Sequence, residues 1–502
     1  LPEPVDLALS IVPAPAQPDI LEDGARNGLK CALIYAARFG EGDDEEGRAR
    51  AERLNGLTRD HGLRICGPNC MGALSFRERL LFYPAARVRA FPEGSAGVVF
   101  QSGGTFQFWL QQAATRGLGF SYAVSSGNEL DLDIADYIDF FVDDEATRLI
   151  VCMLEGIGRP DAFMEAAARA LEAGKPILAL KIGTSERGRQ STVSHTGSLA
   201  GDDDVFNAVC RKYGVVRCAS LDGLIEAGLA FAARRIPAGR RAALSGFSGG
   251  TKGLFLDYAN EQGLPLAEFS AATRDKLAPL IDPGLAPENP LDTGAGLAGL
   301  QKRFSEVCQI VAADDGVDMI AMQGQLPISE AEQPDPETFT AVAAIGKPVI
   351  VLGRMGQNVT EAGRAFQDAT GLPFLQGLPD AVHALKALGD YGAVRRRGVV
   401  PLPEADPAPS RLDDAELQAL LKACHIPPPE SAFAETPEDA AAKAGEIGFP
   451  VALKIVSPEP LHKTELGAVA LHLSDAAAVA AEAAAMLERL PDEIEVSGFL
   501  VQ

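Results

Sequence analysis

The 502-residue sequence lacks the features that mark membrane, secreted and nucleic-acid-binding proteins. No stretch approaches the roughly 18 uncharged apolar residues of a membrane span, and no secretory signal is visible. The eight cysteines form neither a CxxC pair nor a disulfide framework, which favours a reducing cytoplasm. Lysine and arginine total 45 against 69 acidic residues, and a formal net charge of -24 argues against nucleic-acid and anionic-membrane partners.

Apolar residues make up 47% of the sequence, which is enough for large cores, and the length suits about three to four domains. Short apolar runs alternate with amphipathic helical patterns, as in AGVVFQS, RLIVCMLEG, KPILALKIG and KPVIVLG. Several runs are continuously apolar, as strands covered on both faces should be. The pattern predicts an α/β fold built on parallel sheets.

A strand, a Ser-Gly-Gly-Thr turn and a helix occur twice, at residues 96–110 and 242–256. Later segments also correspond, since GKPILALKIG is matched by GKPVIVLGRMG. We therefore expect two tandem flavodoxin-like, parallel-sheet domains at residues 91–237 and 238–400. In these folds, ligands bind beyond the carboxyl ends of the strands.

Three other segments complete the expected organisation. Residues 1–90 form a separate α/β piece, residues 401–410 are a proline-rich linker, and residues 411–502 mix alanine-rich helices with strands. The sequence begins at Leu1 without methionine and ends at Gln502, both within strand-like patterns. We interpret it as a fragment of a longer chain.

The two Ser-Gly-Gly-Thr turns are candidate phosphate cradles, because glycine permits close backbone approach and a helix N-terminus attracts anions. A tight βα turn without a ligand would use the same residues. A matched pair favours function over this alternative. The candidate phosphate-binding residues are Ser102, Gly103, Gly104 and Thr105 in the first turn, and Gly249 and Gly250 in the second.

His195 lies in a loop of small polar residues before a helix expected to begin near Asp202. A neutral imidazole there can serve as a phosphoryl acceptor, with Gly197 among the groups that donate to phosphoryl oxygens. Glu155 ends a buried-strand pattern and is a candidate to orient the ring. The alternatives are a surface histidine and an ordinary carboxylate at a strand end. The second repeat has no equivalent of either residue.

A Gly-Pro-Asn-Cys turn, residues 67–70, follows another strand pattern, and Asn69 can hydrogen-bond a ligand there. An ordinary turn is the alternative. Cys66 and Cys70 are spaced CxxxC without further ligands nearby, so we predict no metal site in this chain.

Near the C-terminus, Lys454 lies in a strand pattern, and a loop carrying His462, Lys463 and Gly467 follows it. Such groups can reach and cover a nucleotide, although solvent-facing lysines have the same pattern.

These motifs resemble the ADP-forming (NDP-forming) acetyl-CoA synthetases, members of the succinyl-CoA synthetase-like superfamily. VSHTGSLAG is similar to their phosphohistidine loop, and MLEGI to the strand bearing the glutamate that holds the histidine. GPNC is similar to their CoA and acyl site. The loop at residues 457–469 is similar to their nucleotide-covering segment, with Ala468 where a second glycine is expected.

The resemblance implies a partial Rossmann-like CoA-binding domain, two flavodoxin-like domains and the first part of an ATP-grasp domain. It implies that an acid, ATP and CoA are converted reversibly into acyl-CoA, ADP and phosphate, through an acyl phosphate and a phosphohistidine at His195. By the same resemblance, the Mg²⁺ ligands are expected beyond Gln502. A homo-oligomer is also compatible with the resemblance. The sequence does not identify the acid substrate, and it does not decide whether the nucleotide is ATP or GTP. The rival interpretations are a regulatory or acyltransferase-associated relative without synthetase chemistry and a CoA- and nucleotide-binding scaffold.

Overall fold

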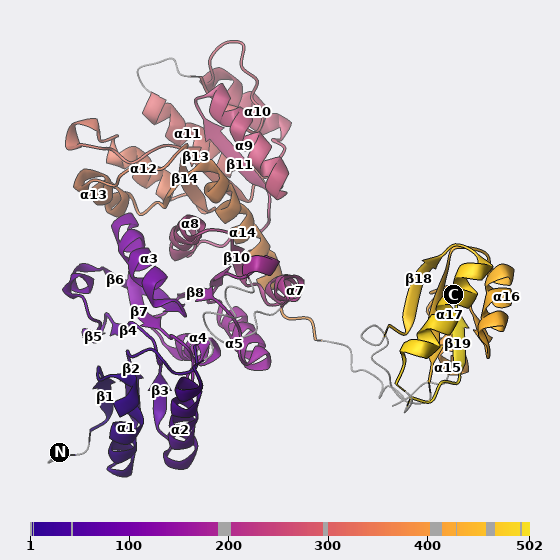
Figure 1. Cartoon of the computed structure of the whole chain (residues 1–502). Helices are drawn as coiled ribbons and strands as arrows, with labels where there is room; N and C mark the ends of the chain where they lie inside the picture. The colour runs from indigo at the N-terminus through magenta and orange to yellow at the C-terminus, as the bar shows by residue number, and fades with distance from the viewer. Residues whose placement is uncertain are drawn as a thin grey trace. The chain divides into compact units, whose positions relative to one another are not determined.

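The protein is described by a computed structural model that covers residues 3, 5–41, 44–188, 202–294, 300–401, 414–427, 429–457, 467–491 and 494–502 (Figure 1). Two compact units divide the chain, Leu1–Pro401 and Leu402–Gln502. No helix among the described residues is long and apolar enough to cross a bilayer.

The first sheet has three parallel strands in the order β1-β2-β3. Its strands are β1 (Leu7–Ser10), β2 (Cys31–Ile34) and β3 (Arg64–Cys66), and its helices are α1 (Gln17–Arg26) and α2 (Glu45–His61). Asp44 caps α2 by accepting a hydrogen bond from the Gly47 amide, and Gly62 ends it in the left-handed region. Leu54, Leu63 and Ile65 are fully buried in the small core of this sheet.

The second sheet has seven strands in the order β10-β9-β8-β6-β7-β4-β5. Strands β6 to β10 are parallel and follow the doubly wound order of flavodoxin-like folds. The strands are β4 (Gly72–Ser75), β5 (Leu80–Phe82), β6 (Glu93–Phe100), β7 (Phe120–Ser125), β8 (Leu149–Leu154), β9 (Ile177–Lys181) and β10 (Val216–Cys218). The helices are α3 (Gly103–Arg116), α4 (Ile134–Asp143), α5 (Pro160–Ala173), α7 (Asp203–Tyr213) and α8 (Leu221–Ala232).

The hairpin of β4 and β5 joins this second sheet by antiparallel pairing of β4 with β7. The sequence pattern had placed these residues in the first segment, 1–90. The turn at residues 67–71 brings the chain onto the end of β7, where Met71 donates its amide proton to the Ser125 hydroxyl at 3.0 Å. The first two sheets are therefore joined through the Gly-Pro-Asn-Cys turn.

The third sheet has five parallel strands in the order β12-β11-β13-β14-β15, the same winding as β6 to β10. The strands are β11 (Ala242–Gly246), β12 (Leu291–Asp292), β13 (Met319–Gln323), β14 (Val349–Gly353) and β15 (Phe374–Gln376). The helices are α9 (Gly249–Gln262), α10 (Ala271–Leu277), α11 (Leu300–Ala312), α12 (Pro336–Ala343), α13 (Glu361–Thr370) and α14 (Leu378–Arg397). The predicted α/β class with tandem flavodoxin-like domains is confirmed.

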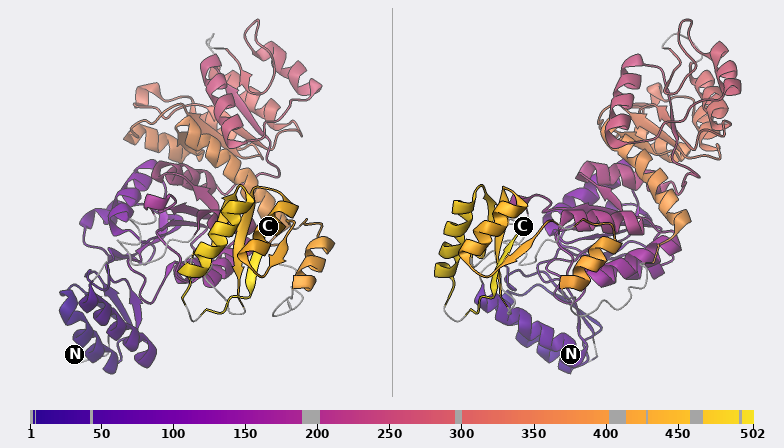
Figure 2. Two further views of the ribbon diagram at one scale, coloured as in Figure 1. Left: turned by 45° about the vertical axis from the view of Figure 1, so that its right-hand side comes forward. Right: turned by 90° about the vertical axis from the view of Figure 1, so that its right-hand side faces the viewer.

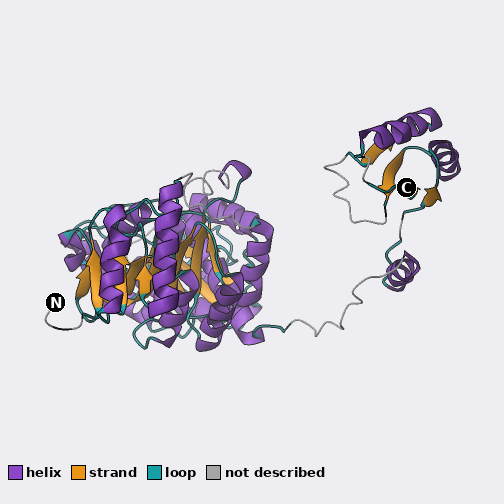
Figure 3. Ribbon diagram, turned by 60° about the horizontal axis from the view of Figure 1, so that its bottom comes forward, coloured by secondary structure: helices purple, strands orange, loops and turns teal. Residues whose placement is uncertain are grey.

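Helices cover both faces of these parallel sheets (Figure 3), which explains why strands such as β8 and β13 are buried at every position. The three sheets of the Leu1–Pro401 unit follow one another in chain order (Figure 2). The last helices of the two repeats, α8 and α14, share one core in which Leu224, Leu385 and Leu388 are buried.

The C-terminal unit contains an antiparallel sheet in the order β16-β19-β17-β18. Its strands are β16 (Ala432–Ala434), β17 (Val451–Val456), β18 (Val469–Leu473) and β19 (Gly498–Val501), and its helices are α15 (Asp414–Ala423), α16 (Pro437–Ile447) and α17 (Ala476–Arg489). Strand β17 alternates buried and half-buried residues, so Leu453 and Ile455 face the core while Lys454 faces the other side.

Candidate active site

The carboxyl ends of β6, β7 and β8 meet at one edge of the second sheet. Phe100 pairs with Ser125 on one side and with Met153 on the other. Because parallel strands keep this register, the residues that follow each strand are neighbours. Gln101 and Glu155 therefore converge at the sheet edge, where ligands bind in such folds.

Glu155 is held at this edge by the side chain of Gln101. The Gln101 Oε1 atom accepts hydrogen bonds from the backbone amides of Glu155 and Gly156, the latter at 3.1 Å. Its Nε2 atom donates to the Gly156 carbonyl at 2.9 Å. Glu155 is 6% exposed, and these hydrogen bonds hold the backbone that carries its side chain.

A second glutamate fixes the orientation of Gln101. Glu129 Oε2 accepts a hydrogen bond from Gln101 Nε2 at 2.8 Å, and Glu129 Oε1 accepts one from the Ser126 hydroxyl at 2.6 Å. Burial raises the pKa of Glu129 to about 7. The residue also has φ of 55°, in the left-handed region that side chains rarely adopt. Such a strained backbone conformation persists only where the surrounding contacts hold it in place.

Glu129 and Glu155 line a cavity of about 250 Å³ together with Gln101, Asp131, Asp133 and Arg159. Arg159 is already paired with Asp133 at 2.6 Å and with Asp136 at 2.5 Å. Asp131 is paired with Arg64, which does not line the cavity, at 2.9 Å. The lining holds four carboxylates against one arginine, so the cavity is acidic. Its charge suits a ring with N–H donors, such as an imidazole, better than a free anion.

The Gly-Pro-Asn-Cys turn forms a rim next to this cavity: it does not line the cavity itself, but it contacts Asn128 and Leu130, which do. The Pro68 carbonyl accepts a hydrogen bond from the Asn128 amide at 2.9 Å, and Asn69 Nδ2 donates to Asn128 Oδ1 at 3.2 Å. Gly127 allows this approach, since a Cβ there would lie 2.2 Å from the Pro68 oxygen. Gly67 accepts from the Leu130 amide at 3.1 Å.

Asn69 and Cys70 differ in their availability to a ligand. Asn69 is half-buried at the surface of the turn, with φ of 57°. Cys70 is 3% exposed and directs its sulfur to the Ile34 carbonyl at 3.3 Å. A hydrogen bond with Cys66, together with burial, raises the pKa of Cys70 well above that of a free thiol. Cys70 is therefore a buried support of the turn, and Asn69 is the side chain of the turn that a ligand can reach.

The first Ser-Gly-Gly-Thr turn opens α3 beside this rim. Ser102 caps the helix by accepting a hydrogen bond from the Thr105 amide at 3.4 Å. Gly103 packs against the rim, because a Cβ there would lie 2.5 Å from Met71 Cγ. A Cβ at Gly104 would meet nothing within 4 Å. The helix N-terminus thus presents open space beside Gly104, as a phosphate cradle requires.

The second Ser-Gly-Gly-Thr turn opens α9 with the same cap, and the Thr251 amide donates to the Ser248 hydroxyl at 3.4 Å. Gly249 and Gly250 are exposed at the edge of the third sheet. Among the described residues, no hydrogen bond or ion pair links this turn to the first turn. The two helix N-termini are equivalent in the repeats, and each belongs to its own sheet.

Four predicted site residues, His195, Gly197, His462 and Lys463, lie outside the described residues. The described residues on either side of His195 are anchored close to Glu155. Ile182 donates its amide proton to the Leu154 carbonyl at 2.9 Å, and the Lys181 amine lies 3.7 Å from Asp203. Asp202 caps α7 as expected, accepting hydrogen bonds from the amides of Asp204 and Val205.

The predicted nucleotide-binding residues belong to the C-terminal unit. Lys454 Nζ donates to Gln502 Oε1 at 2.5 Å. Gly467 precedes β18 with φ of 61°, and its carbonyl accepts a hydrogen bond from Arg489 at 3.4 Å. Within the described part of the chain, no group of three or more acidic, histidine or cysteine side chains is placed to hold a metal ion.

Gln101, Asn128, Glu129 and Arg159 were not identified as site residues from the sequence. For Asn128 and Glu129 the signal available was the segment SSGNELDLD, a polar run directly after a buried strand; Gln101 and Arg159 lie outside it. Such a run marks the ligand-binding edge of a parallel sheet.

Comparison with known proteins agrees with this arrangement. Residues 93–231 match the succinyl-CoA ligase-like flavodoxin domain, and residues 406–502 match an ATP-grasp domain. The alpha subunit of ADP-forming acetate–CoA ligase II from Pyrococcus furiosus is 30% identical over 393 residues, which cover 77% of this chain and 84% of that subunit. The chain belongs to the ADP-forming acyl-CoA synthetases.

A trans-feruloyl-CoA synthase from an unidentified prokaryote is 30% identical to this synthetase over 493 residues. The alignment covers 94% of this chain and 68% of that protein. An acetyl-coenzyme A synthetase from Candidatus Korarchaeum cryptofilum, solved with phosphate and ADP, superposes with a TM-score of 0.69 at 27% identity. That superposition covers 79% of this chain and 84% of the other. The synthetase is therefore a CoA ligase of a family that acts on CoA, a carboxylic acid and a nucleotide.

Proposed function

We propose that this synthetase carries a phosphoryl group on His195 while it interconverts an acyl-CoA, phosphate and a nucleoside diphosphate with an acid, CoA and a nucleoside triphosphate. The observation that carries the proposal is the buried Glu155, clamped by Gln101 in an acidic cavity beside the α3 N-terminus. A histidine acceptor needs an orienting carboxylate and a phosphate cradle within reach. Both lie at this one sheet edge.

The position of the chain on either side of His195 supports this assignment. Asp202, the helix cap, lies seven positions after His195, which allows a reach of up to ~25 Å. Ile182 and Asp203 are both tied to the end of the strand pair that carries Glu155. The imidazole can thus approach the cavity that Glu155 lines without moving the sheet.

In the direction of nucleotide synthesis, a phosphate oxygen attacks the thioester carbonyl carbon and the CoA thiolate leaves, which gives an acyl phosphate. An imidazole nitrogen of His195 then attacks phosphorus, the P–O bond to the acyl group breaks, and the carboxylic acid leaves as its anion. Glu155 accepts the other ring N–H and stabilises the positive charge that forms on the ring. The amides at Gly103 and Gly104 neutralise phosphoryl oxygens during transfer.

We propose the rim at residues 67–69 as the part of the site that contacts CoA or the acyl group. The Asn69 side-chain amide is held by Asn128, and Asn128 lines the cavity. Lys454 and Gly467 are proposed to contact the nucleotide, together with His462 and Lys463. We propose that Mg²⁺ accompanies the nucleotide.

The test uses the full-length protein, with wild type, His195→Ala and Glu155→Gln compared side by side. Each is incubated with γ-labelled ATP and magnesium, and acid-labile, base-stable protein phosphate is measured. We expect label on wild type only, discharged by CoA with one acid of a panel, and much slower labelling of Glu155→Gln with folding intact. Label that survives His195→Ala, or no label on folded wild type from ATP or GTP, would overturn the proposal.

A further inference from the structure

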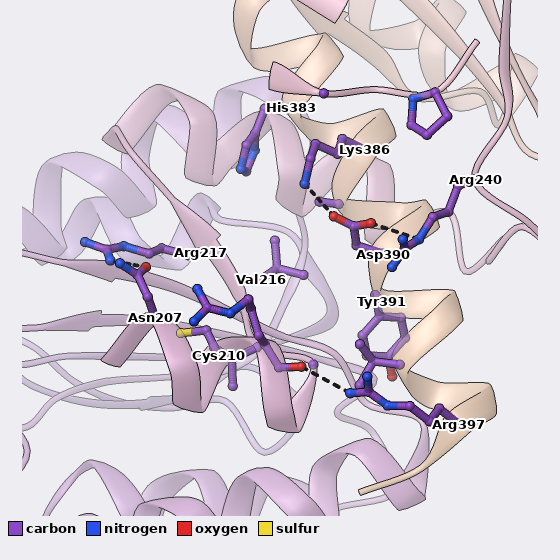
Figure 4. Close-up of a pocket in the computed structure, with 17 residues that line it drawn as sticks. Asn207, Cys210, Val216, Arg217, Arg240, His383, Lys386, Asp390, Tyr391 and Arg397 are labelled. Atoms are coloured by element: carbon purple, nitrogen blue, oxygen red, sulfur yellow. Dashed lines mark hydrogen bonds and ion pairs between the residues drawn. The ribbon is translucent and has the colours of Figure 1, made fainter. Parts of the chain in front are cut away.

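A second cavity, of about 500 Å³, lies where the two flavodoxin-like repeats meet (Figure 4). The first repeat contributes α7 and β10. The second repeat contributes α14 and the residues that precede β11. Figure 4 shows Arg217 and Asn207 on one wall, with Lys386, Asp390 and Tyr391 of α14 on the opposite wall. No residue of this cavity belongs to the site around Glu155.

The lining of this seam cavity is strongly basic in a chain whose net charge is -24. Asp390 is the one carboxylate that lines it, and it pairs with both Arg240 at 3.0 Å and Lys386 at 2.5 Å. The cationic lining residues are Arg211, Arg217, Arg240, Lys386 and Arg397. The lining thus has five cationic side chains and one carboxylate, and that carboxylate is shared by two of the cations. The cavity wall therefore carries a clear excess of positive charge.

The two arginines at the ends of their helices carry most of this excess. The Arg397 side chain makes a single long hydrogen bond, 3.4 Å, to the Arg211 carbonyl. The Arg211 guanidinium has no hydrogen-bond or ion-pair partner among the described residues, and both side chains are exposed at the cavity mouth. By contrast, Arg217 is occupied by Asp203 at 2.8 Å.

An independent observation concerns Tyr391, which is 2% exposed. Its hydroxyl has no hydrogen-bond partner among the described residues, although nearly all buried polar groups in proteins have one. Burial raises the pKa of Tyr391 to about 12, so the hydroxyl remains a donor at neutral pH. The hydroxyl oxygen is itself closed to solvent, although Tyr391 lines the cavity, so a ligand reaches this unpaired donor only when a neighbouring side chain moves aside.

We propose that this seam cavity binds a small molecule carrying adjacent phosphate groups. Such a ligand would accept hydrogen bonds from Arg211 and Arg397, which are charge-assisted and therefore strong, and from Tyr391 once its hydroxyl is uncovered. The volume lies in the usual range for small-molecule sites, ~300–1,000 Å³. Val215, Val216 and Val394 also line the cavity and suit a less polar portion of the ligand.

The shared chemistry is a diphosphate, which inorganic diphosphate, a nucleoside diphosphate and CoA all carry. The cavity is formed by residues at the amino ends of β10 and β11, whereas Glu155 follows the carboxyl end of β8. Binding at the seam is therefore separate from the proposed phosphoryl-transfer site, and does not depend on it.

The experiment is a calorimetric titration of the full-length protein with inorganic diphosphate, ADP and CoA in separate arms, at constant ionic strength. The variants are Arg211→Gln/Arg397→Gln and Tyr391→Phe. The matched control is Arg395→Gln, an exposed arginine on α14 that does not line the cavity. His195 labelling by γ-labelled ATP is measured on every variant, to keep this test apart from that of the proposed function.

We expect one ligand to show a binding event that Arg395→Gln retains. The double variant should weaken this event by about tenfold or more, and Tyr391→Phe by about three- to tenfold. ADP and CoA are also expected to bind at the reaction sites, so each of these two titrations should show two binding events. In those titrations, the readout is the loss of one of the two binding events. Unchanged binding in the folded double variant, or no event for any of the three ligands, would overturn the proposal whatever the labelling shows.

Discussion

Arg116, at the end of α3, and Glu226, in the middle of α8, form a buried ion pair where the two repeats meet. Arg116 contacts both carboxylate oxygens of Glu226, and its Nη2 atom also donates to the Phe374 carbonyl at 2.9 Å. Glu226 Oε2 accepts from the Gln376 amide at 2.9 Å. Glu226 is 2% exposed, and burial raises its pKa. The pair therefore ties the first repeat to β15 of the second.

The first prediction concerns this pair. Arg116→Ala leaves the Glu226 carboxyl buried without its cation, so we expect a loss of about 3–5 kcal/mol in the free energy of unfolding. Trp109 is the single tryptophan and is buried in the core next to α8, with its indole N–H donating to the Leu221 carbonyl. Its fluorescence during urea unfolding reports on this region.

The matched control is Arg116→Met combined with Glu226→Gln, which removes both charges and keeps an acceptor for the Gln376 amide. It should recover most of the lost stability, because uncharged replacements of a buried pair are often nearly neutral. A double variant as unstable as Arg116→Ala would show that packing, rather than the unpaired charge, sets the loss.

The second prediction concerns Gln101. Gln101→Ala removes the clamp on the Glu155–Gly156 backbone, and we expect the rate of protein labelling by γ-labelled ATP to fall roughly 10- to 100-fold. The melting temperature should change little, because Gln101 is half-buried at the sheet edge. Gln112→Ala, an exposed position on α3, is the control. Equal labelling rates in the two variants would remove Gln101 from the site.

Local patterns predicted the parts of this structure that depend on neighbouring residues in sequence. Continuous apolar runs identified β8 and β14, and the two Ser-Gly-Gly-Thr turns were correctly predicted to lie between a strand and a helix. The repeat in the sequence corresponds to the same strand order in the two sheets.

The features that the sequence did not predict depend on pairing between strands that are distant in the chain. Gln101, Glu129 and Glu155 follow three different strands, and only the register of β6 with β7 and β8 brings them together. The β4–β5 hairpin joined the second sheet for the same reason, since its partner β7 lies about 50 residues further along. The seam cavity was likewise not predictable from local patterns, because it forms only where the two repeats contact each other.

The third prediction concerns the pH dependence of stability. Glu129 has a pKa of about 7 in the folded protein against an ordinary value of 4.5. Below the lower value the carboxyl is protonated in both states and contributes nothing. As the pH rises between the two values, the unfolded state ionises first, so the folded state loses stability, up to about 3 kcal/mol above the higher value.

Glu129→Gln removes this cost and keeps an acceptor for Gln101. The stability of the variant relative to wild type should therefore increase from about pH 5 to about pH 8. Chemical unfolding followed by Trp109 fluorescence at several pH values checks this. Glu165→Gln, on the exposed side of α5, should show no such trend. A difference between Glu129→Gln and wild type that is flat with pH would contradict the assignment.

The fourth prediction separates two adjacent glycines of the phosphate cradle. Gly104→Ala places a methyl group in open space, so the fold should be retained, and alanine favours the helix over glycine by up to about 1 kcal/mol. The same methyl group would occupy the position of an incoming phosphoryl oxygen, and we expect labelling of the protein to fall roughly 10- to 100-fold. Gly103→Ala instead places its methyl group 2.5 Å from Met71 Cγ and should destabilise the protein by about 1–3 kcal/mol.

The two variants should thus divide function from stability at neighbouring positions on one helix. Labelling rates and melting temperatures of both, measured together, give the comparison. If Gly104→Ala labels as fast as wild type while remaining folded, the open space at the α3 N-terminus does not receive phosphate, and the glycine is required only for the turn. If it labels slowly and melts at or above the wild-type temperature, the loss arises in the cradle itself, because no change in folding accounts for it.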